Sequence, residues 1–350
     1  MFELKRLWLQ YDEVMHQKWK QLMERANLDI HDQIEYTLGI FDGEDLIATG
    51  SFDRNIIKCL VVCQNYQSED LLSKMLTSLM QEIRQNGFNH FFIYTSPEKE
   101  AIFQSLGFQT IIKTADILFL EQGNPNLDSY LAMLRQKKIM GVTDAGAIVM
   151  NANPFTKGHQ YLVEHACRIC SHVYVFVLSD NQSEFSANDR MEMVKAGVAH
   201  LKNVTVLPTN DYMVSSATFP AYFLKDKAPL AQASVQARLD ALLFKHKIAP
   251  ILEIRSRFVG DEPFSKVTDV YNQAMQEVFQ PEIQLHVLKR LAIDNQTISA
   301  TKVRKALKEH DEQLLLHFLP QTTYNYLKQY YNNLEVNISG NQNEFSSRNR

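Results

Sequence analysis

The feature that most constrains the fold is a strand, a turn and a helix within AGAIVMNANPFTKGHQYLVEHACRIC, residues 145–170. Ala147–Met150 is an unbroken apolar run, which is typical of a strand buried on both faces of a parallel sheet. Asn151–Phe155 predicts a tight turn, and from Gly158 onward apolar side chains recur at helical spacing. A helix that starts at the carboxyl edge of a parallel sheet presents free amide groups that favour phosphate. The segment therefore predicts an α/β domain with an anion site at this turn.

A second segment of the same kind, Ile298–Arg304, follows a predicted strand and loop and leads into a helix. Ser299 and Thr301 carry hydroxyls at the helix start, and Arg304 adds a permanent charge with a fork geometry that suits phosphate oxygens. The alternative is that Ser299 is only a helix N-cap and Arg304 a solvated helix residue. Because the two segments bracket an alternating α/β pattern, we expect a Rossmann-like doubly wound parallel sheet over residues 143–332.

The pattern between the two segments supplies the remaining strands of this sheet. Apolar runs predict a second strand at 171–179, a third at 203–209, a fourth at 251–263 and a fifth at 283–291. The fourth run ends in a glycine turn with Gly260 and Asp261, at the edge where the loops of a nucleotide site collect.

Length and composition set the outer limits. A chain of 350 residues with 45% apolar residues predicts about two globular domains. The net charge of −4 provides no bulk electrostatic case for binding nucleic acid or an anionic membrane. Four cysteines are too few for a disulfide framework, and we interpret them as buried structural thiols. The N-terminus lacks the apolar core of a signal peptide and no apolar run is long enough to span a bilayer, so we expect a cytoplasmic protein.

The first 122 residues alternate helix and strand around a hairpin. Residues 11–28 have a helical pattern, and Tyr36–Phe52 predicts the hairpin because Asp42-Gly43 is a strong turn signal between two β-rich runs. A strand (56–62), a helix (71–83), a strand (90–95), a short helix, a turn at Gly107 and a last strand follow. This order resembles the Gcn5-related acetyltransferase (GNAT) fold, which implies an N-terminal α+β domain.

The phosphate-gripping turn of the GNAT fold is altered in this chain. That fold uses a glycine-rich turn so that backbone N–H groups can approach the pyrophosphate of acetyl-CoA. The corresponding stretch is Gln67–Leu72, with Asp70 and Leu72 at the glycine positions. We therefore favour a structural or carrier-docking role over acetyl transfer at this site. Residues 123–142 predict a connector and residues 333–350 a polar, disordered tail.

Residues 153–159 resemble the (H/T)xGH motif of the nucleotidylyltransferase superfamily, and Ile298–Arg304 resembles its ISSTxxR motif. The resemblance implies attack on the α-phosphate of ATP with release of diphosphate. This displacement builds charge on phosphate oxygens, which fixed cations and hydrogen-bond donors stabilise. Taken alone, His159 is equally well interpreted as a helix-capping histidine, and Asp261 as a turn residue. The expected catalytic residues are Thr156, Lys157 and His159, and the expected ATP-binding residues are Asn153, Phe155, Gly158, Gly260, Asp261, Ser299, Thr301 and Arg304.

Longer stretches narrow the resemblance to one family. The GNAT-like front half together with DRMEMVKAG, YMVSSATFPAYFLK and RFVGDEPFSKVTDVYNQAM resembles the citrate lyase ligase family over residues 1–330. The resemblance implies an acid–thiol ligase that uses ATP to activate acetate as acetyl-adenylate. The acetyl group then passes to the thiol of the CoA-derived prosthetic group on the acyl-carrier subunit of citrate lyase, and AMP and diphosphate are released. The front domain is then expected to hold the carrier or its arm.

The acetate pocket and the metal are less constrained by the sequence. Acetate is a small anion, so its pocket is expected to offer a cation and aromatic walls. Position alone suggests Arg190, Thr218 and Phe219, with Lys157 as a further candidate that is equally a solvated loop lysine. Mg²⁺ is expected to accompany ATP, held by phosphates and water rather than by a protein site. The alternatives are a mononucleotide or phosphopantetheine adenylyltransferase, which shares both motifs, and a non-catalytic carrier-binding protein.

Overall fold

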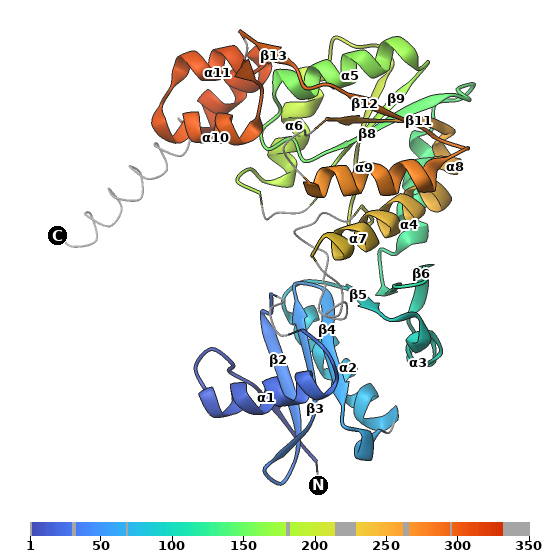
Figure 1. Ribbon diagram of the computed structural model, residues 1–350, viewed down its shortest axis with the longest axis vertical. Helices are drawn as coiled ribbons and strands as arrows, with labels where there is room; N and C mark the ends of the chain where they lie inside the picture. Colours follow the sequence, from blue (N-terminus) through green and yellow to red (C-terminus); the bar gives the residue numbers. More distant parts are fainter. Residues whose placement is uncertain are drawn as a thin grey trace, which may run out of the picture. The chain divides into compact units, whose positions relative to one another are not determined.

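The computed structural model describes residues 2–29, 33–67, 69–179, 183–213, 229–261, 266–294 and 296–331. Contacts divide the chain into two compact units, and each is described by itself (Figure 1). The described residues of the first unit fall within 1–136, 214–248 and 273–278, and those of the second within 137–213, 249–272 and 279–350. The boundaries expected from the sequence, at 122, 142 and 332, stay a prediction.

The first unit contains a seven-stranded sheet in the order β1-β2-β3-β4-β5-β7-β6. All neighbours are antiparallel except β4 and β5, which are parallel and pair only through Ile56 with Phe92 and Ile57 with Ile93. The strands are β1 (Glu3–Arg6), β2 (Tyr36–Asp42), β3 (Asp45–Asp53), β4 (Ile56–Val62), β5 (His90–Thr95), β6 (Gln109–Lys113) and β7 (Leu118–Gly123). The expected hairpin is β2–β3, with Asp42 paired to Asp45 across a turn in which Gly43 has φ +60°.

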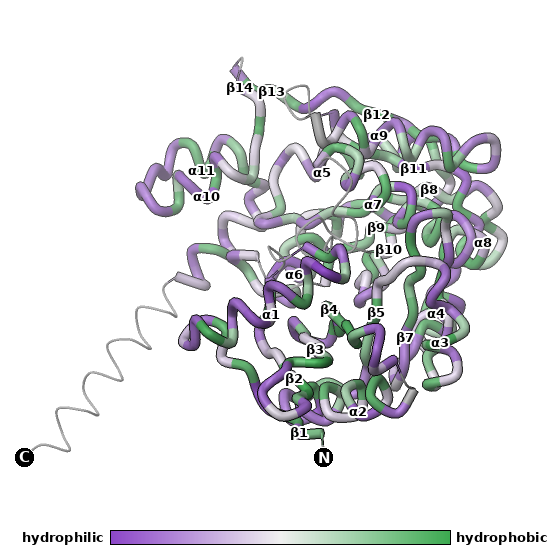
Figure 2. Tube along the Cα trace, turned by 60° about the horizontal axis from the view of Figure 1, so that its bottom comes forward, coloured by the Kyte–Doolittle hydropathy of each residue, from purple (hydrophilic) through white to green (hydrophobic). Residues whose placement is uncertain are grey.

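Two helices pack on this sheet through separate apolar clusters. Helix α1 (Glu13–Arg25) contributes Trp19, Leu22 and Met23 to one cluster, and α2 (Glu69–Gln85) contributes a row that includes Leu79 and Ile83 to the other. Figure 2 shows hydrophobic residues gathered on the strands and alternating with hydrophilic ones along the helices. The remaining elements of this unit are η1 (Gln64–Tyr66), η2 (Pro97–Lys99), α3 (Glu100–Ser105), α4 (Leu127–Lys137), α7 (Pro229–Leu243) and the π-helical turn η4 (Phe244–Ile248).

Two strands of this sheet were not expected from the sequence. Strand β1 is an exposed edge strand of only four residues and has no apolar alternation to mark it. Strand β7 inserts between β5 and β6, and its last residues have the polar composition that suggested a connector. The short helix expected in the connector is α4, which begins earlier, at Leu127.

The second unit contains a five-stranded, entirely parallel sheet in the order β10-β9-β8-β11-β12. The strands are β8 (Ala145–Met150), β9 (Val173–Val177), β10 (Val204–Pro208), β11 (Ile254–Gly260) and β12 (Gln284–Leu288). β8, which comes first along the chain among these five strands, lies in the middle of the sheet, so the strand order reverses beside it. A ligand site is expected at the carboxyl end of such a reversal point. The predicted fold class, a Rossmann-like sheet with an N-terminal α+β domain, is confirmed.

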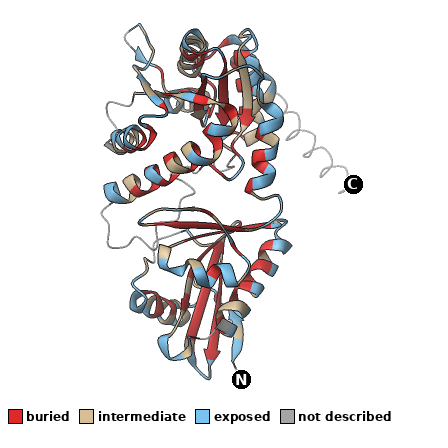
Figure 3. Ribbon diagram, turned by 90° about the vertical axis from the view of Figure 1, so that its right-hand side faces the viewer, coloured by how far each residue is buried: buried red, intermediate tan, exposed pale blue. Residues whose placement is uncertain are grey.

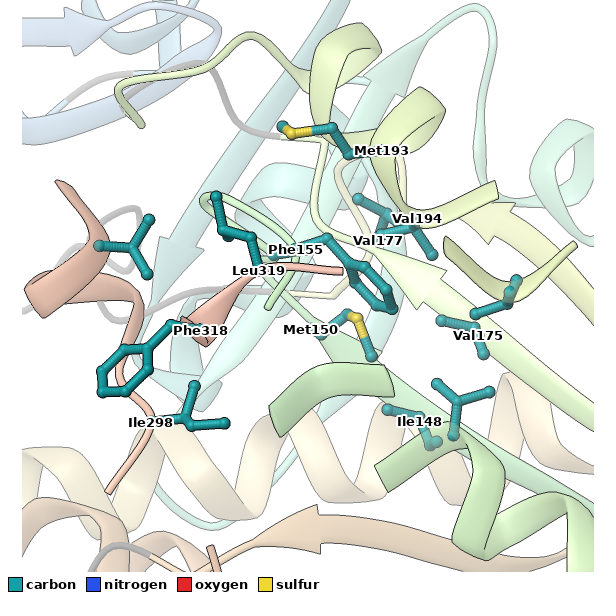
Figure 4. Close-up of a cluster of buried hydrophobic side chains, with 14 of the residues drawn as sticks. Ile148, Met150, Phe155, Val175, Val177, Met193, Val194, Ile298, Phe318 and Leu319 are labelled. Carbon is teal, nitrogen blue, oxygen red and sulfur yellow. The ribbon is translucent and has the colours of Figure 1, made fainter. Parts of the chain in front are cut away.

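One large apolar cluster joins several helices of this unit to the sheet (Figure 4). It joins Ile148 of β8 and Val175 of β9 to Met193 and to Phe318, so strands and helices share one core. Figure 3 shows these strands buried and the helices buried along one side only. The helices are α5 (Lys157–Ile169), α6 (Ala187–Val198), α8 (Ala249–Leu252), α10 (Ala300–Glu309), α11 (Glu312–Phe318) and the first part of α9 (Lys266–Phe279), whose residues 273–278 belong to the first unit. A small ribbon pairs β13 (Ala292–Ile293) with β14 (Gln296–Thr297).

The cysteines and the helix lengths bear on two expectations from the sequence. All four cysteines are free thiols, with Cys59 and Cys170 buried. Burial raises the pKa of Cys167 to about 11, so this thiol is protonated and unreactive at neutral pH. Within the described ranges, no helix combines the length and apolar character that a bilayer crossing requires.

Candidate active site

The turn after β8 is anchored in the core by Phe155. This side chain is fully buried and lies in the cluster between β8 and β9 (Figure 4). It packs so closely against α6 that a Cβ atom on Gly197 would lie 2.3 Å from the ring. The ring also stacks on His159, with centroids 5.7 Å apart and planes 18° apart. Phe155 therefore fixes the first turn of α5 against the sheet.

A capping box orients His159. Thr156 is the N-cap of α5, and its Oγ1 accepts a hydrogen bond from the His159 backbone N–H at 3.4 Å. In return, Nδ1 of His159 accepts from the Thr156 backbone N–H at 3.0 Å. Because Nδ1 is an acceptor, the neutral ring carries its proton on Nε2. His159 is thus a positioned N–H donor at the start of a helix.

The surroundings of His159 determine whether its imidazole is charged. Burial, and secondarily the charge of Arg290, lower the pKa of His159 to about 4. The ring is therefore neutral at physiological pH and contributes a hydrogen bond rather than a positive charge. Thr156 is 2% exposed and its hydroxyl lies in the capping box, so it orients His159.

The second motif joins the first at this edge. Ser299 is the N-cap of α10, and its side chain makes no capping hydrogen bond. Ile298 lies close to Gly158, since a Cβ atom built on Gly158 would be 3.6 Å from the Ile298 Cγ2 atom. Arg304 donates from Nη1 to the carbonyl of Asn153 at 2.7 Å and from Nη2 to Thr301 Oγ1 at 3.2 Å. The two helix starts, far apart in the sequence, therefore form one site.

Lys157 points to a different element. Its Nζ donates to the carbonyls of Leu316 and His317, at 3.0 and 2.9 Å. These carbonyls lie at the carboxyl end of α11, where a cation is favourable because the last carbonyls lack helical partners. Lys157 therefore connects the start of α5 to the end of α11 through hydrogen bonds.

Arg190 is also engaged with the protein. It is fully buried, and it donates from Nε to the carbonyl of Phe185 at 3.1 Å and from Nη1 to the carbonyl of Asn151 at 3.0 Å. These hydrogen bonds stabilise the turn after β8 from its buried side. The other two acetate-pocket candidates, Thr218 and Phe219, lie outside the described residues.

The turn after β11 completes the edge. Gly260 has open space where a side chain would be, and the Asp261 N–H donates to the Leu288 carbonyl at 2.7 Å. Arg290, just beyond β12, donates from Nε to the Asp261 carbonyl at 2.9 Å. We did not single out Arg290 in the sequence; the available signal was a cation two residues after the last parallel strand.

The described residues suit an anion better than a protein-bound metal. In the part of the chain that the structure covers, no three His, Cys, Asp or Glu side chains are grouped as metal ligands would be. The edge instead presents a neutral N–H donor, guanidinium groups and two helix N-termini. This donor set can hold phosphate oxygens.

The chain is similar to a family of known ligases. The family profile described as the citrate lyase ligase C-terminal domain matches residues 145–327. A citrate (pro-3S)-lyase ligase of Haemophilus influenzae (strain ATCC 51907 / DSM 11121 / KW20 / Rd) is 36% identical over 310 residues, which is 86% of this chain and 91% of the relative. One of Escherichia coli (strain K12) is 33% identical over 315 residues, covering 88% and 89%.

A solved N-acetyltransferase from Staphylococcus aureus Mu50 covers 36% of this chain and 99% of its own, at 19% identity and a TM-score of 0.29. The family resemblance seen in the sequence is confirmed by the family profile and the two ligases: the chain belongs to the citrate lyase ligase family.

Proposed function

We propose that this protein uses ATP to acetylate the thiol of the CoA-derived prosthetic group on the acyl-carrier subunit of citrate lyase. The observation that carries the proposal is the junction of the two helix starts at the reversal point of a parallel sheet, with His159 as an N–H donor and Arg304 bonded to the Asn153 carbonyl. Such a junction suits the α-phosphate of a nucleotide.

The reaction proceeds in two steps. A carboxylate oxygen of acetate attacks the α-phosphorus of ATP, the bond from that phosphorus to the oxygen bridging the α- and β-phosphates breaks, and diphosphate leaves. The product is acetyl-adenylate, a mixed anhydride. The carrier thiolate then attacks the acetyl carbon, and AMP leaves with the oxygen that acetate brought.

The described residues have separate tasks in the first step. The Nε2–H of His159 and the amides at the start of α5 donate to phosphate oxygens as their charge grows. Arg304 supplies positive charge while its bond to Asn153 holds the two motifs together. Thr156 and Phe155 keep the imidazole in place and in the required tautomer.

We further propose that a cleft in the first unit holds the prosthetic-group arm of the carrier. It has a volume of about 1080 Å³ and is lined from β4 by Leu60–Val62 and from β5 by Thr95. Because β4 and β5 pair with each other at only two positions, the strands diverge along the cleft, and an extended arm with its own amides can lie between them. Leu72 lines the cleft where a GNAT fold has a phosphate-binding glycine, which favours an arm over free acetyl-CoA.

Acetate-dependent exchange of labelled diphosphate into ATP tests the activation step. The proposal expects exchange that requires acetate and is independent of the carrier. No exchange with acetate, but exchange with dephospho-CoA or a dinucleotide product, would identify the protein as a nucleotide-forming adenylyltransferase instead.

Filling the cleft tests the arm site separately. Ile102 lines the cleft and is 40% exposed, so Ile102→Trp is expected to raise KM for the carrier at least tenfold and to leave diphosphate exchange unchanged. Val14→Trp, at a 63% exposed position outside the cleft lining, is the matched control. An unchanged KM in Ile102→Trp would exclude the cleft as the arm site.

A further inference from the structure

Arg290 occupies a position at the candidate active site that the motifs do not describe. It is exposed, lies two residues beyond the end of β12, and donates from Nε to the carbonyl of Asp261. The Asp261 N–H in turn donates to the carbonyl of Leu288. These two bonds join the loops after β11 and β12, so the guanidinium is held at the carboxyl edge of the sheet.

Arg290 and His159 follow neighbouring parts of one sheet edge. His159 comes after β8 and Arg290 after β12, and both strands run parallel to β11 between them, so their carboxyl ends lie at the same edge. Burial, and after it the charge of Arg290, lower the pKa of His159. His159 and Arg290 therefore lie at the same edge although they come from different strand–helix units.

The other candidate cations are directed elsewhere or partly offset. Lys157 donates to the end of α11, and Arg190 is fully buried under the turn after β8. Arg304 donates to Asn153, and its Nε lies 4.0 Å from a carboxylate oxygen of Glu184. Since His159 is neutral, a further positive group at this edge is needed to balance the negative charge of a nucleoside triphosphate.

We propose that Arg290 binds phosphate oxygens of ATP and supplies the positive charge that His159 does not. This proposal rests on the proposed function, because it assumes that a nucleotide is bound at this edge. The division of tasks is physically consistent: burial, assisted by the charge of Arg290, keeps the imidazole neutral, and a neutral imidazole with an occupied Nδ1 retains its Nε2–H for donation.

The test measures nucleotide binding without turnover. Binding of α,β-methylene-ATP to the full chain is measured by calorimetry, without acetate, for wild type, Arg290→Gln, Arg290→Lys and Lys289→Gln. Loss of a hydrogen bond to a charged group predicts about 10- to 100-fold weaker binding for Arg290→Gln. Arg290→Lys is expected to bind between wild type and Arg290→Gln. Lys289→Gln, at the exposed neighbouring residue, is expected to stay within about threefold.

Two further measurements separate the alternatives. The pKa of His159, followed by NMR, is expected to be higher in Arg290→Gln than in wild type and unchanged in Lys289→Gln. In the exchange assay, Arg290→Gln is expected to raise KM for ATP and leave KM for acetate within twofold.

Three outcomes would overturn the proposal. Unchanged nucleotide binding in Arg290→Gln would show that Arg290 only connects the loops after β11 and β12. A rise confined to KM for acetate would make it a carboxylate-binding residue. If Arg290 only stabilises the loops, Arg290→Gln and Arg290→Lys, which both lack the Nε donor to Asp261, have lowered thermal midpoints and bind the nucleotide equally weakly. Absence of acetate-dependent exchange in the wild type would instead refute the proposed function, while the binding comparison would still decide the role of Arg290.

Discussion

Replacing His159 is the perturbation that bears most directly on the chemistry of the site. The imidazole is fixed at two points: Nδ1 accepts from the Thr156 N–H at 3.0 Å, and the ring stacks on Phe155. Its Nε2–H is therefore a preorganised donor that needs no rearrangement when charge develops on phosphate. Removing one such donor typically costs about 2.7–4 kcal/mol of transition-state stabilisation, which is about 10²- to 10³-fold in rate.

We therefore expect His159→Ala to lower the rate of acetate-dependent diphosphate exchange by about 10²- to 10³-fold, with a smaller change in KM for ATP. The matched control is His200→Ala, since His200 is half exposed and pairs with Glu164 at the surface. A loss of less than tenfold, with a folded variant, would remove His159 from the stabilisation of the transition state.

Four further predictions concern the surroundings of His159 and the turn after β8. The pKa of His159, about 4, predicts that exchange shows no inflection near pH 6.5 and is lost as the pH falls through about 4, because protonation of Nδ1 opposes the Thr156 N–H; an inflection near 6.5 in a pH–rate profile would contradict this. The unfolded chain binds this proton near pH 6.5, whereas the folded chain binds it only near pH 4. The contribution of the neutral ring to the free energy of unfolding is therefore complete above pH 6.5 and decreases as the pH falls from 6.5 to 4. Urea titrations at several pH values measure this decrease. Gly197→Ala places a Cβ 2.3 Å from the Phe155 ring, so it is expected to cost about 1–3 kcal/mol in urea unfolding and to slow exchange by displacing His159; wild-type kinetics would show that the ring moves freely. Arg190→Met leaves the buried carbonyl of Phe185 and the part-buried carbonyl of Asn151 without this donor, and it is expected to lower the free energy of unfolding by more than about 2 kcal/mol. Arg168→Met, at an exposed position, is expected to change the free energy of unfolding by less than about 0.5 kcal/mol.

Local patterns were sufficient for most of the fold. Parallel strands buried on both faces, such as β8 and β9, have continuous apolar sequences, and the Asp42-Gly43 turn marks its hairpin directly. Strands β1 and β7 were missed for opposite reasons. The first is a short, exposed edge, and the second continues into polar residues whose strand conformation depends on pairing with β5.

The candidate site was predictable in its residues and less so in their roles. That Thr156 and His159 begin a helix follows from their order in the chain. The direction of the Lys157 side chain does not, because its partners are carbonyls about 160 residues away in α11. Likewise, Arg190 has the charge of a substrate-binding residue, but tertiary packing buries it under a turn. Long-range hydrogen bonds of this kind leave no local pattern in a sequence.

The central claim is that acetate oxygen attacks the α-phosphorus before the acetyl group reaches a thiol. It is tested most directly with acetate labelled with ¹⁸O in both carboxylate oxygens, ATP, magnesium and the thiol form of the citrate lyase carrier, followed by mass spectrometry of the AMP. Acetyl-adenylate formation predicts one ¹⁸O atom in each AMP molecule released with acetylated carrier. Unlabelled AMP together with acetylated carrier would contradict the account.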